Sequence, residues 1–538
     1  MYRAWFCLRN EFEHASSDPA DTFKDVFLRY SGDGVMGPDH LQRLLVEVQG
    51  EVDATKKTAM QIIDSQGLEC KHLSLDAFFR YLASDDNSPL NPSLGVHHDM
   101  NAPLSQYFIY TGHNSYLRGN QLSSESSDIP IIKALNRGVR VIELDLWPNS
   151  TKTDIEVRHG RTLTTPVEFV KCLNSIKKHA FVASPYPVII TLEDHLTSDL
   201  QAKAAEILKE IFGDSLFYPT SESLQEFPSP EELKFRIMIS TKPPKPPKPY
   251  FNAEHNDAND ASEQMSQRQV THEYKRMISI CSKKRKENMK DSLEFDERRP
   301  TRLSLNELLF EKAIVTCGEE VIRFTQKNIL RIYPKMTRVN SSNYNPILGW
   351  IYGAQMVALN MQGYGRSLWL MHGFFRANGG CGYIKKPDFL TKFDPNDEIF
   401  NPMENLPVKK ILKVKIYLGY GWHTKLNQTN MGTSLPPILS TKVGIVGVPS
   451  DTIANKTKRI QDWTPIWNEE FEFELRVPEL ALLQIRVHKC NVAEKDGFGG
   501  QTCLPIFELR PGIRAVPLFD RKGNEFKPVK LIMHFEFV

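Results

Sequence analysis

The order of apolar and polar positions divides the chain into regions of different character. Residues 1–95 carry apolar stripes with helical spacing over Ala20–Tyr30 and Pro38–Glu47, which predicts a helical domain. Residues 103–247 alternate short apolar runs with longer amphipathic stretches, and this order predicts parallel strands linked by crossover helices. Residues 406–538 hold short runs of period-two alternation between turn residues, which predicts an antiparallel β-sandwich.

The middle of the chain predicts a second block of strands after an interruption. Residues 248–300 are polar, mixed in charge and poor in aliphatic side chains, and they follow a proline- and lysine-rich run, so they predict a flexible linker. Residues 301–405 return to an ordered pattern, in which Ile329–Tyr333, Met356–Asn360 and Leu368–Phe374 are expected to be barrel strands. The fold class that follows is a multidomain combination of α/β and all-β parts.

The loop between the two predicted N-terminal helices has the outline of an EF-hand. Its centre, Ser31–Gly34, lacks the regular run of oxygen side chains and the bidentate glutamate that calcium requires. We therefore expect a structural pair of helices rather than a calcium site.

Composition excludes several classes of protein. A chain of 538 residues exceeds a single hydrophobic core, and a net charge of +2 gives no reason to expect nucleic-acid binding. The 8 cysteines are scattered without a CxxC pair, so we expect reduced thiols and no zinc site. No apolar run reaches the roughly 20 residues of a spanning helix, and the N-terminus lacks a signal-peptide pattern, so membrane contact is expected to be peripheral.

Polar groups suited to phosphate chemistry stand where apolar runs end in the 103–247 block. Because active-site groups of a parallel barrel gather at the carboxyl ends of its strands, such groups can assemble a metal site with acid–base partners. The groups are His113 and Asn114, Glu143 and Asp145, His159, and Glu193.

The carboxylates of this set favour a hard metal ion. Glu143 and Asp145 lie two positions apart on one strand and therefore share a face, where they repel each other unless a cation or a proton intervenes. A salt bridge to a lysine or arginine is the alternative. With Glu193 and the Asn114 amide they make an all-oxygen set suited to calcium, and no cluster of imidazoles or thiolates points to zinc.

The two histidines of the set remain for proton transfer. Histidine titrates near neutral pH, so His113 and His159 can act as polar catalysts beside a metal shell. A single histidine is more often structural, but two that flank a metal shell favour catalysis.

Several motifs together resemble phosphoinositide-specific phospholipase C. His113–Tyr116, Glu143–Asp145, Arg158–Gly160 and Thr191–His195 resemble the X box of that family. Three later stretches resemble the Y box of the same family: Arg331–Pro334, Ser341–Tyr344 and Asn378–Tyr383. The order of an EF-hand-like region, X, linker, Y and C2 domain is similar to the plant-type members, and it implies a split (β/α)8 barrel of TIM type.

The resemblance implies a role for each matching residue. Asn114, Glu143, Asp145 and Glu193 match the ligands of a catalytic Ca²⁺ ion. His113 matches the residue that stabilises charge on the phosphate, His159 matches the general acid, and Glu143 is a candidate proton acceptor. The inositol ring and its phosphates are expected at Lys242, Ser304, Arg331 and Tyr333. A family lysine two positions before Lys242 is Ser240 here, which implies the loss of one cationic contact.

The implied activity is calcium-dependent hydrolysis of phosphatidylinositol 4,5-bisphosphate and related lipids to diacylglycerol and inositol phosphate in signalling, through a cyclic phosphate. The expected protein is a monomer on the cytoplasmic face of the plasma membrane, with inositol phospholipids as its partners. One alternative is a catalytically weak membrane tether or scaffold. Another is a different barrel phosphodiesterase, such as a glycerophosphodiesterase, but those open with His-Arg-Gly-like motifs and need no split barrel or C2 domain.

The C2 region departs from the plant pattern at its calcium-binding tip. Aspartates expected there are replaced by Tyr420, Ile438, Asn491 and Gly497, with Asp496 nearby, so calcium binding at the tip should be weak or absent. Membrane docking would then depend on lysines such as Lys409, Lys410 and Lys413, on apolar loop residues or on a partner. A solvated strand edge is the alternative interpretation of those lysines.

Overall fold

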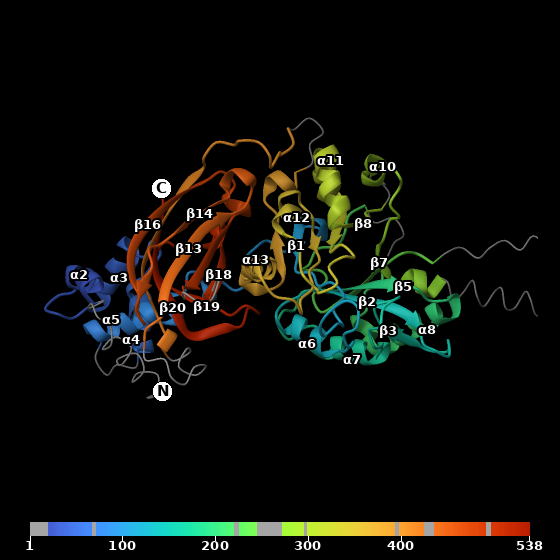
Figure 1. Cartoon of the computed structure of the whole chain (residues 1–538), viewed down its shortest axis with the longest axis horizontal. Helices are drawn as coiled ribbons and strands as arrows, with labels where there is room; N and C mark the ends of the chain where they lie inside the picture. The colour runs from blue at the N-terminus through green and yellow to red at the C-terminus, as the bar shows by residue number, and fades with distance from the viewer. Residues whose placement is uncertain are drawn as a thin grey trace, which may run out of the picture. The chain divides into compact units, whose positions relative to one another are not determined.

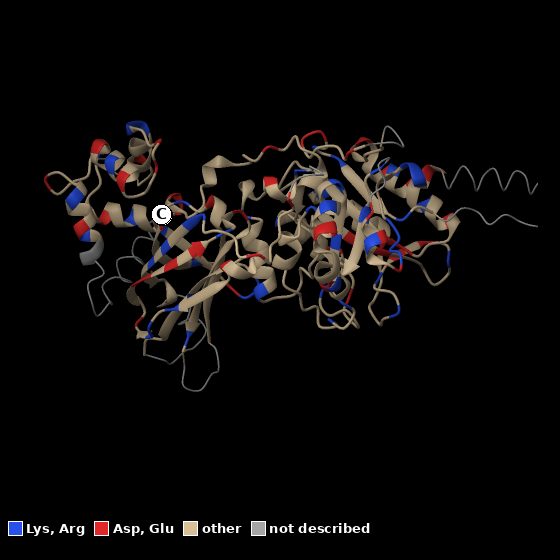
Figure 2. Cartoon of the chain, turned by 90° about the horizontal axis from the view of Figure 1, so that it is seen from above, with Lys and Arg blue, Asp and Glu red and all other residues tan. Residues whose placement is uncertain are grey.

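The chain forms two compact units, one built mainly on parallel strands and one on helices and an antiparallel sheet (Figure 1). A computed structural model describes residues 20–66, 71–219, 225–244, 272–294, 299–392, 398–423, 435–490 and 497–538. Unit 1 comprises Met1–Leu94, His372–Phe374 and Met403–Val538, and unit 2 comprises Gly95–Met371 and Phe375–Pro402. Basic and acidic residues are interspersed along the ribbon of both units (Figure 2), in keeping with the small net charge.

Unit 1 begins with the predicted helices. They are α2 (Ala20–Tyr30), α3 (Pro38–Glu47), α4 (Lys56–Ser65) and α5 (Leu75–Ala83). An antiparallel bridge between Met36 and Leu73 joins the two interhelical loops, and Gly32 and Val35 exchange backbone hydrogen bonds of 2.9 and 3.0 Å. The first loop is thereby closed by its own backbone hydrogen bonds.

The antiparallel sandwich of unit 1 pairs its strands in the order β14-β13-β17-β18-β19-β20-β12-β16, with β15 on β13. Its core is aliphatic and aromatic, with Trp422 and Trp467 both 1% exposed. The strands are β12 (Lys410–Tyr420), β13 (Ile438–Val446), β14 (Ile453–Lys456), β15 (Ile460–Gln461), β16 (Ile466–Leu475), β17 (Leu482–Lys489), β18 (Gly497–Pro505), β19 (Gly512–Phe519) and β20 (Glu525–Phe537).

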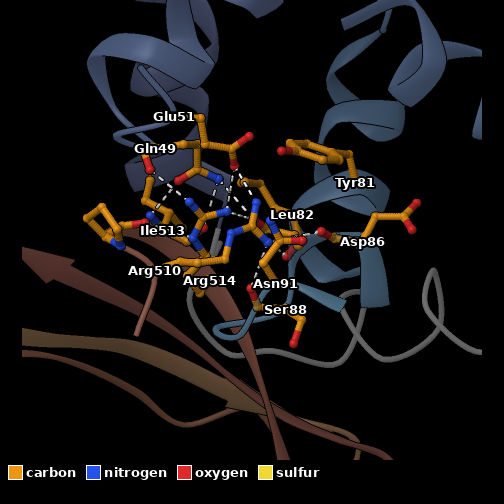
Figure 3. Close-up of polar contacts among 12 residues, drawn as sticks. Gln49, Glu51, Tyr81, Leu82, Asp86, Ser88, Asn91, Arg510, Ile513 and Arg514 are labelled. Carbon is orange, nitrogen blue, oxygen red and sulfur yellow. Dashed lines mark hydrogen bonds and ion pairs between the residues drawn. The ribbon is translucent and has the colours of Figure 1, made fainter. Parts of the chain in front are cut away.

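A buried polar cluster joins the helices of unit 1 to its sandwich (Figure 3). Arg514 on β19 is fully buried, and every nitrogen of its guanidinium donates a hydrogen bond. Nε donates to the Pro511 carbonyl at 2.8 Å, Nη1 to Glu51 at 2.9 Å, and Nη2 to the Gln49 carbonyl at 2.7 Å. The Gln49 side chain in turn pairs with both backbone groups of Ile513. The cluster therefore extends hydrogen bonding from strand β19 to the segment that follows helix α3.

The parallel strands of unit 2 close into a ring. Pairing in the sheets gives the runs β2-β5-β6-β7 and β8-β9-β10, all parallel. Three parallel bridges complete the circle: Thr111–Val141 joins β1 to β2, Ser282–Arg302 joins β7 to β8, and Leu359–Gly112 joins β10 to β1. The fold is a (β/α)8 barrel of TIM type, split between β6 and β7, as the sequence predicts.

The ring strands are β1 (Tyr107–Ile109), β2 (Val141–Pro148), β5 (Val188–Asp194), β6 (Ile237–Thr241), β7 (Ile278–Cys281), β8 (Arg302–Asn306), β9 (Ile329–Tyr333) and β10 (Met356–Val357). Three short strands lie off the ring: β3 (Ile155–Val157), β4 (Val167–Glu168) and β11 (Tyr383–Lys385). The helices are α6 (Ile129–Asn136), α7 (Phe169–His179), α8 (Ser198–Phe212), α10 (Met289–Leu293), α11 (Glu307–Lys327), α12 (Ile347–Ile351) and α13 (Arg366–Phe374), the last of which ends in unit 1.

The structure corrects three sequence predictions. Leu368–Phe374 is helical, in α13, because a short apolar run suits a buried helix as well as a strand. The predicted linker 248–300 contains the ring strand β7 and helix α10, and its residues 248–271 lie outside the described chain. The stretch Ile155–Val157 pairs antiparallel with β2, so the strand before His159 is not a ring strand.

None of the six cysteines among the described residues forms a disulfide. No helix in the described part of the chain is both long and apolar enough to cross a membrane.

Candidate active site

The predicted metal ligands gather at the carboxyl ends of β1, β2 and β5. Asp145 on β2 is the register partner of Glu193 on β5, and Glu143 lies one inward position below Asp145. The loop after β1 brings Asn114 to the same place, where its backbone N–H donates to Glu143 Oε2 at 3.0 Å. Asn114 has a φ of 42°, in the left-handed region that asparagine tolerates better than most residues. Glu143, Asp145 and Asn114 are buried, whereas Glu193 is exposed.

The electrostatics of this cluster differ between its two buried carboxylates. Burial raises the pKa of Glu143, but Arg331 and then His113 more than offset it, so the pKa of Glu143 lies below its ordinary value. Burial and the charges of Glu193 and Glu143 raise the pKa of Asp145 well above its ordinary value. Glu143 thus has a cationic partner, and Asp145 does not.

The residues fit a calcium ion. Asp145 Oδ1 is buried and makes no hydrogen bond of normal geometry with the described residues, although the Tyr116 hydroxyl, itself without such a bond, lies close to the Asp145 carboxylate. An incompletely satisfied buried carboxylate is costly unless a ligand completes it. The donor set around it is three carboxylates and one amide, all hard oxygen donors. Calcium is therefore the ion that Asn114, Glu143, Asp145 and Glu193 suit best.

Both predicted histidines reach the same mouth of the barrel. His113 Nδ1 lies 2.9 Å from Asn360 Oδ1, and its Nε2 is 4.0 Å from Glu143 Oε2. Burial lowers the pKa of His113, although Glu143 opposes this shift. His159 Nδ1 lies 2.7 Å from the backbone carbonyl of Gln121.

The backbone next to His159 passes very close to Trp147 on β2. A Cβ added to Gly160 would stand 2.0 Å from the Trp147 ring, so only glycine fits there. This close approach explains how an off-ring strand places His159 near the ring.

The predicted ring-phosphate residues come from both halves of the barrel. Arg331 on β9 is buried and forms a hydrogen-bonded ion pair with Glu143 Oε1, while its guanidinium lies 5.2 Å from the Tyr333 ring centroid. Ser304 on β8 is the register partner of Arg331, and its hydroxyl has no hydrogen-bond partner among the described residues. Lys242 is exposed directly after β6. The ion pair that the sequence left as an alternative to a metal therefore exists, but it satisfies Glu143 alone.

Ser240, which stands where the family has a lysine, is fully buried beside a different cation. Arg302 Nη1 donates to Ser240 Oγ at 2.8 Å and to Thr191 Oγ1 at 3.2 Å. Arg302 is 5% exposed, and its Nε has no partner in the described chain. Burial, and after it the charge of Arg331, lower the pKa of Arg302 to about 9. A cation therefore remains close to the position of the lost lysine, supplied from β8.

Sequence reasoning missed the residues that support the site. Gln121, Ser341 and Asn360 are buried polar side chains that hydrogen-bond to one another and to the site residues. Ser341 lies in the Ser341–Tyr344 motif, which was used above only as evidence of the family resemblance. Arg302 could have been found from the alternation on β8, because it shares a face with Ser304.

The C-terminal sandwich gives less support to the docking residues. Tyr420 is 4% exposed and packs in the core between helices and sandwich, so it is not a tip residue. Lys409 pairs with Glu479 at 3.1 Å and Lys413 with Glu472 at 3.5 Å, which favours the solvated strand edge. Asn491 and Asp496 lie outside the described residues.

The sequence matches four family profiles in the predicted order. These are the EF-hand-like region of phosphoinositide-specific phospholipase C over residues 20–92, the X domain of phosphatidylinositol-specific phospholipase C over residues 100–243, its Y domain over residues 274–389, and a C2 domain over residues 410–519. The Y match includes β7, in agreement with the shortened linker.

Relatives match along the whole chain. Phosphoinositide phospholipase C 2 of Arabidopsis thaliana is 52% identical, covering 100% of this chain and 99% of the relative. The 1-phosphatidylinositol 4,5-bisphosphate phosphodiesterase delta-3 of Mus musculus is 33% identical, covering 95% of this chain and 67% of the relative. The crystal structure of L. pealei PLC21 shares the fold, with a TM-score of 0.78 at 24% identity over 96% of this chain and 68% of that one. The chain therefore belongs to the phosphoinositide-specific phospholipase C family and is an enzyme of that family.

Proposed function

We propose that this enzyme hydrolyses phosphatidylinositol 4,5-bisphosphate in a calcium-dependent reaction that passes through a cyclic inositol phosphate and yields diacylglycerol. The observation that carries the proposal is the buried, incompletely satisfied carboxylate Asp145 beside Glu143, Glu193 and Asn114, with two histidines at the same mouth of the barrel. The mouse relative bears the name of a phosphatidylinositol 4,5-bisphosphate phosphodiesterase, which supports this choice of lipid.

Calcium, when bound, would lower the pKa of the inositol 2-hydroxyl and neutralise charge that develops on the phosphate. Glu143 is ionised and held by Arg331, so it can accept the proton of that hydroxyl. Attack on the 1-phosphate forms the new ring and releases the diacylglycerol oxygen, and water then opens the cyclic ester. The nucleophile belongs to the lipid, so the protein needs no serine or cysteine nucleophile.

The histidines are placed for the remaining proton and charge. His159 directs Nδ1 to a backbone carbonyl, which can only accept, so the ring proton on Nδ1 is fixed and Nε2 is left to exchange a proton with the leaving oxygen. His113 is buried beside Glu143, and a bound phosphate would favour its protonated form over the neutral one.

The ring phosphates would be held by Lys242, Ser304, Arg331 and Tyr333. The Ser304 hydroxyl and the Arg331 Nε both lack a hydrogen-bond partner among the described residues. Positively charged and hydroxyl donors of this kind suit phosphate oxygens. Access to the lipid is peripheral, through the C2 domain, and its depleted tip makes docking less dependent on calcium than the chemistry is.

The test is release of water-soluble inositol phosphate from phosphatidylinositol 4,5-bisphosphate in mixed micelles, with calcium buffered from chelator excess to millimolar. We expect activity that requires calcium and is lost in Glu143→Gln and His159→Ala. Glu125→Gln is the matched control, because Glu125 is an exposed carboxylate that pairs with Arg118 on the surface. Near-wild-type turnover in both site variants, or no calcium-dependent release by the wild-type enzyme, contradicts the proposal.

A tether that binds the lipid without cleaving it is the second candidate, favoured by Ser240 in place of a lysine. It predicts saturable binding to phosphoinositide vesicles and no inositol phosphate at any calcium concentration.

A further inference from the structure

We propose that Gln121 is a positioning residue for the active site: its side-chain amide turns the Asn114 carbonyl toward the metal, and its contacts set the proton positions of both histidines. The inference rests on the proposed calcium chemistry. Gln121 is 6% exposed and lies in the loop after β1, between the segments that carry the site residues.

The direction of the hydrogen bonds begins at a backbone carbonyl. Ser341 Oγ donates its single proton to the Gly119 carbonyl at 2.7 Å, so this oxygen can only accept from Gln121 Nε2 at 2.8 Å. The other end of the Gln121 amide is then its oxygen, which accepts from Asn114 Nδ2 at 2.8 Å. Asn114 is thereby held through its nitrogen, and its carbonyl oxygen is the atom left for a cation.

The same amide reaches His113 through Asn360. Gln121 Nε2 also donates to Asn360 Oδ1 at 3.1 Å, and that oxygen lies 2.9 Å from His113 Nδ1. The orientation of Asn360 is fixed because its Nδ2 donates to the Ser342 carbonyl at 3.3 Å. Because Asn360 Oδ1 can only accept a hydrogen bond, the His113 ring must carry its proton on Nδ1. The other ring nitrogen, Nε2, then faces Glu143.

The backbone of Gln121 completes the arrangement. Its N–H donates to the Val339 carbonyl at 2.8 Å, and its own carbonyl faces His159 Nδ1 at 2.7 Å. Ser341, Asn360 and Val339 belong to the second half of the barrel, whereas Gln121, Asn114 and His159 belong to the first. This hydrogen-bond relay, which runs from the Gly119 carbonyl through Gln121 to Asn114, therefore makes the orientation of a ligand in one half of the barrel depend on residues of the other half.

A purely structural role for Gln121 makes a different prediction. A buried amide that only satisfies its neighbours would stabilise the fold, and its loss would lower stability without a specific change in metal affinity. Residues that orient metal ligands typically change metal affinity or activity by about 10–100-fold when replaced.

The chain offers a matched control in Gln362. Its Nε2 donates to Ser341 Oγ at 3.2 Å and to the Gly119 carbonyl at 3.3 Å, so it touches the same start of the relay. Within the described part of the chain, no hydrogen bond joins Gln362 to Asn114, His113 or His159. Gln121→Met and Gln362→Met therefore remove similar hydrogen bonds, but only the first reaches the ligand.

The experiment measures calcium binding to the full-length enzyme by calorimetry, with binding that is lost in Glu143→Gln taken as the catalytic site. We expect Gln121→Met to weaken this binding about 10–100-fold, and Gln362→Met to leave it within about twofold of wild type. The calcium concentration for half-maximal hydrolysis should shift by the same factor, and thermal unfolding in chelator should report the stability of both variants.

A double-variant cycle separates action through Asn114 from any other cause. In Asn114→Gly, a substitution that the backbone accepts, adding Gln121→Met should weaken calcium binding no further. Unchanged calcium affinity in Gln121→Met, or equal losses in both methionine variants, would overturn the inference. If the wild-type enzyme neither binds calcium nor hydrolyses the lipid, the proposed function itself fails, which is a distinct result.

Discussion

Two clusters of buried arginines in this protein have opposite hydrogen-bonding states. In unit 1, Arg514 donates from all of its nitrogens to Glu51, Gln49, Asn87 and a nearby carbonyl. In unit 2, both Arg302 and Arg331 bury an Nε with no partner in the described chain. Ser304 and Asp145 nearby also have unpartnered oxygens.

In the first cluster every guanidinium nitrogen of Arg514 donates a hydrogen bond, whereas in the second several buried polar atoms have no partner among the described residues and are available to a ligand. A satisfied buried network stabilises one arrangement of two parts, here the helices and the sandwich of unit 1. Buried groups without partners cost free energy, and they persist where a substrate or an ion completes them. We therefore assign Arg514 to stability and propose that Arg331 and Arg302 act on the substrate.

The strongest test of this assignment is Arg331→Met. In the proposed site Arg331 both holds a ring phosphate and pairs with the proton acceptor Glu143, so its removal should lower kcat/KM for phosphatidylinositol 4,5-bisphosphate by about 10²–10³-fold. Glu143 would lose its cationic partner, so the variant should be destabilised in chelator and recover when calcium is added. Steady-state kinetics and thermal unfolding at two calcium levels check both effects. Full activity would assign Arg331 to structure alone.

The reciprocal test is Arg514→Met. It leaves the buried Gln49 carbonyl without the Arg514 donor, so the free energy of unfolding should fall by about 3 kcal/mol, while Asn87 Oδ1 still accepts from Gln49 and Arg510 still pairs with Glu51. Hydrogen exchange should place the lost protection in unit 1. The kcat of the folded enzyme should stay near wild type, and a selective loss of kcat would remove the contrast between the clusters.

A smaller effect is expected for Arg302→Met. Loss of this charge should raise KM for phosphatidylinositol 4,5-bisphosphate by about 10-fold, in line with one charge-assisted contact. The effect on phosphatidylinositol, which lacks ring phosphates, should be smaller. Adding Ser240→Lys to this variant restores a cation from the other strand and should recover part of the affinity. Equal effects on both lipids would show that Arg302 interacts with the carboxylates of the site, Glu143 and Glu193, rather than with a ring phosphate.

The smallest expected effect concerns Lys386, a buried lysine that belongs to neither of the two arginine clusters. Burial holds the pKa of Lys386 well below its ordinary value, while its Nζ donates to the Thr325 carbonyl at 2.8 Å. The folded state then binds fewer protons than the unfolded state, so stability should rise with pH up to the ordinary lysine pKa near 10.4. Urea unfolding of Lys386→Met should show a weaker rise between pH 7 and pH 10. An identical pH slope would contradict the shift.

The sequence predicted the fold well where the apolar pattern was long or regular. The limits of α2 and α3 follow from periodicity, and so does the antiparallel character of residues 406–538, although β14, β15, β18 and β19 were not predicted individually. β7 was missed because Ile278 and Ile280 form a short alternating run among charged neighbours, which resembles linker in composition. The run Leu368–Phe374 carries no periodicity that separates helix from strand.

The candidate site was predicted to the extent that its groups stand at strand ends. Register on adjacent parallel strands brings Asp145 beside Glu193, as alternation and strand order imply. The supporting residues could not be predicted in this way, because Gln121 and Asn360 lie 239 positions apart and meet only when the ring closes. Likewise, the sequence near Ser240 does not indicate that the Arg302 side chain lies beside Ser240 and donates a hydrogen bond to it.

The left-handed backbone at Asn114 restricts how this site can evolve. Glutamine carries the same amide, yet its longer side chain has none of the local hydrogen bonding that makes a φ of 42° tolerable for asparagine. Glycine accepts the backbone but supplies no oxygen. In the proposed site one position must satisfy a conformational requirement and a chemical one together, so we expect it to accept only asparagine and, at the cost of another negative charge, aspartate.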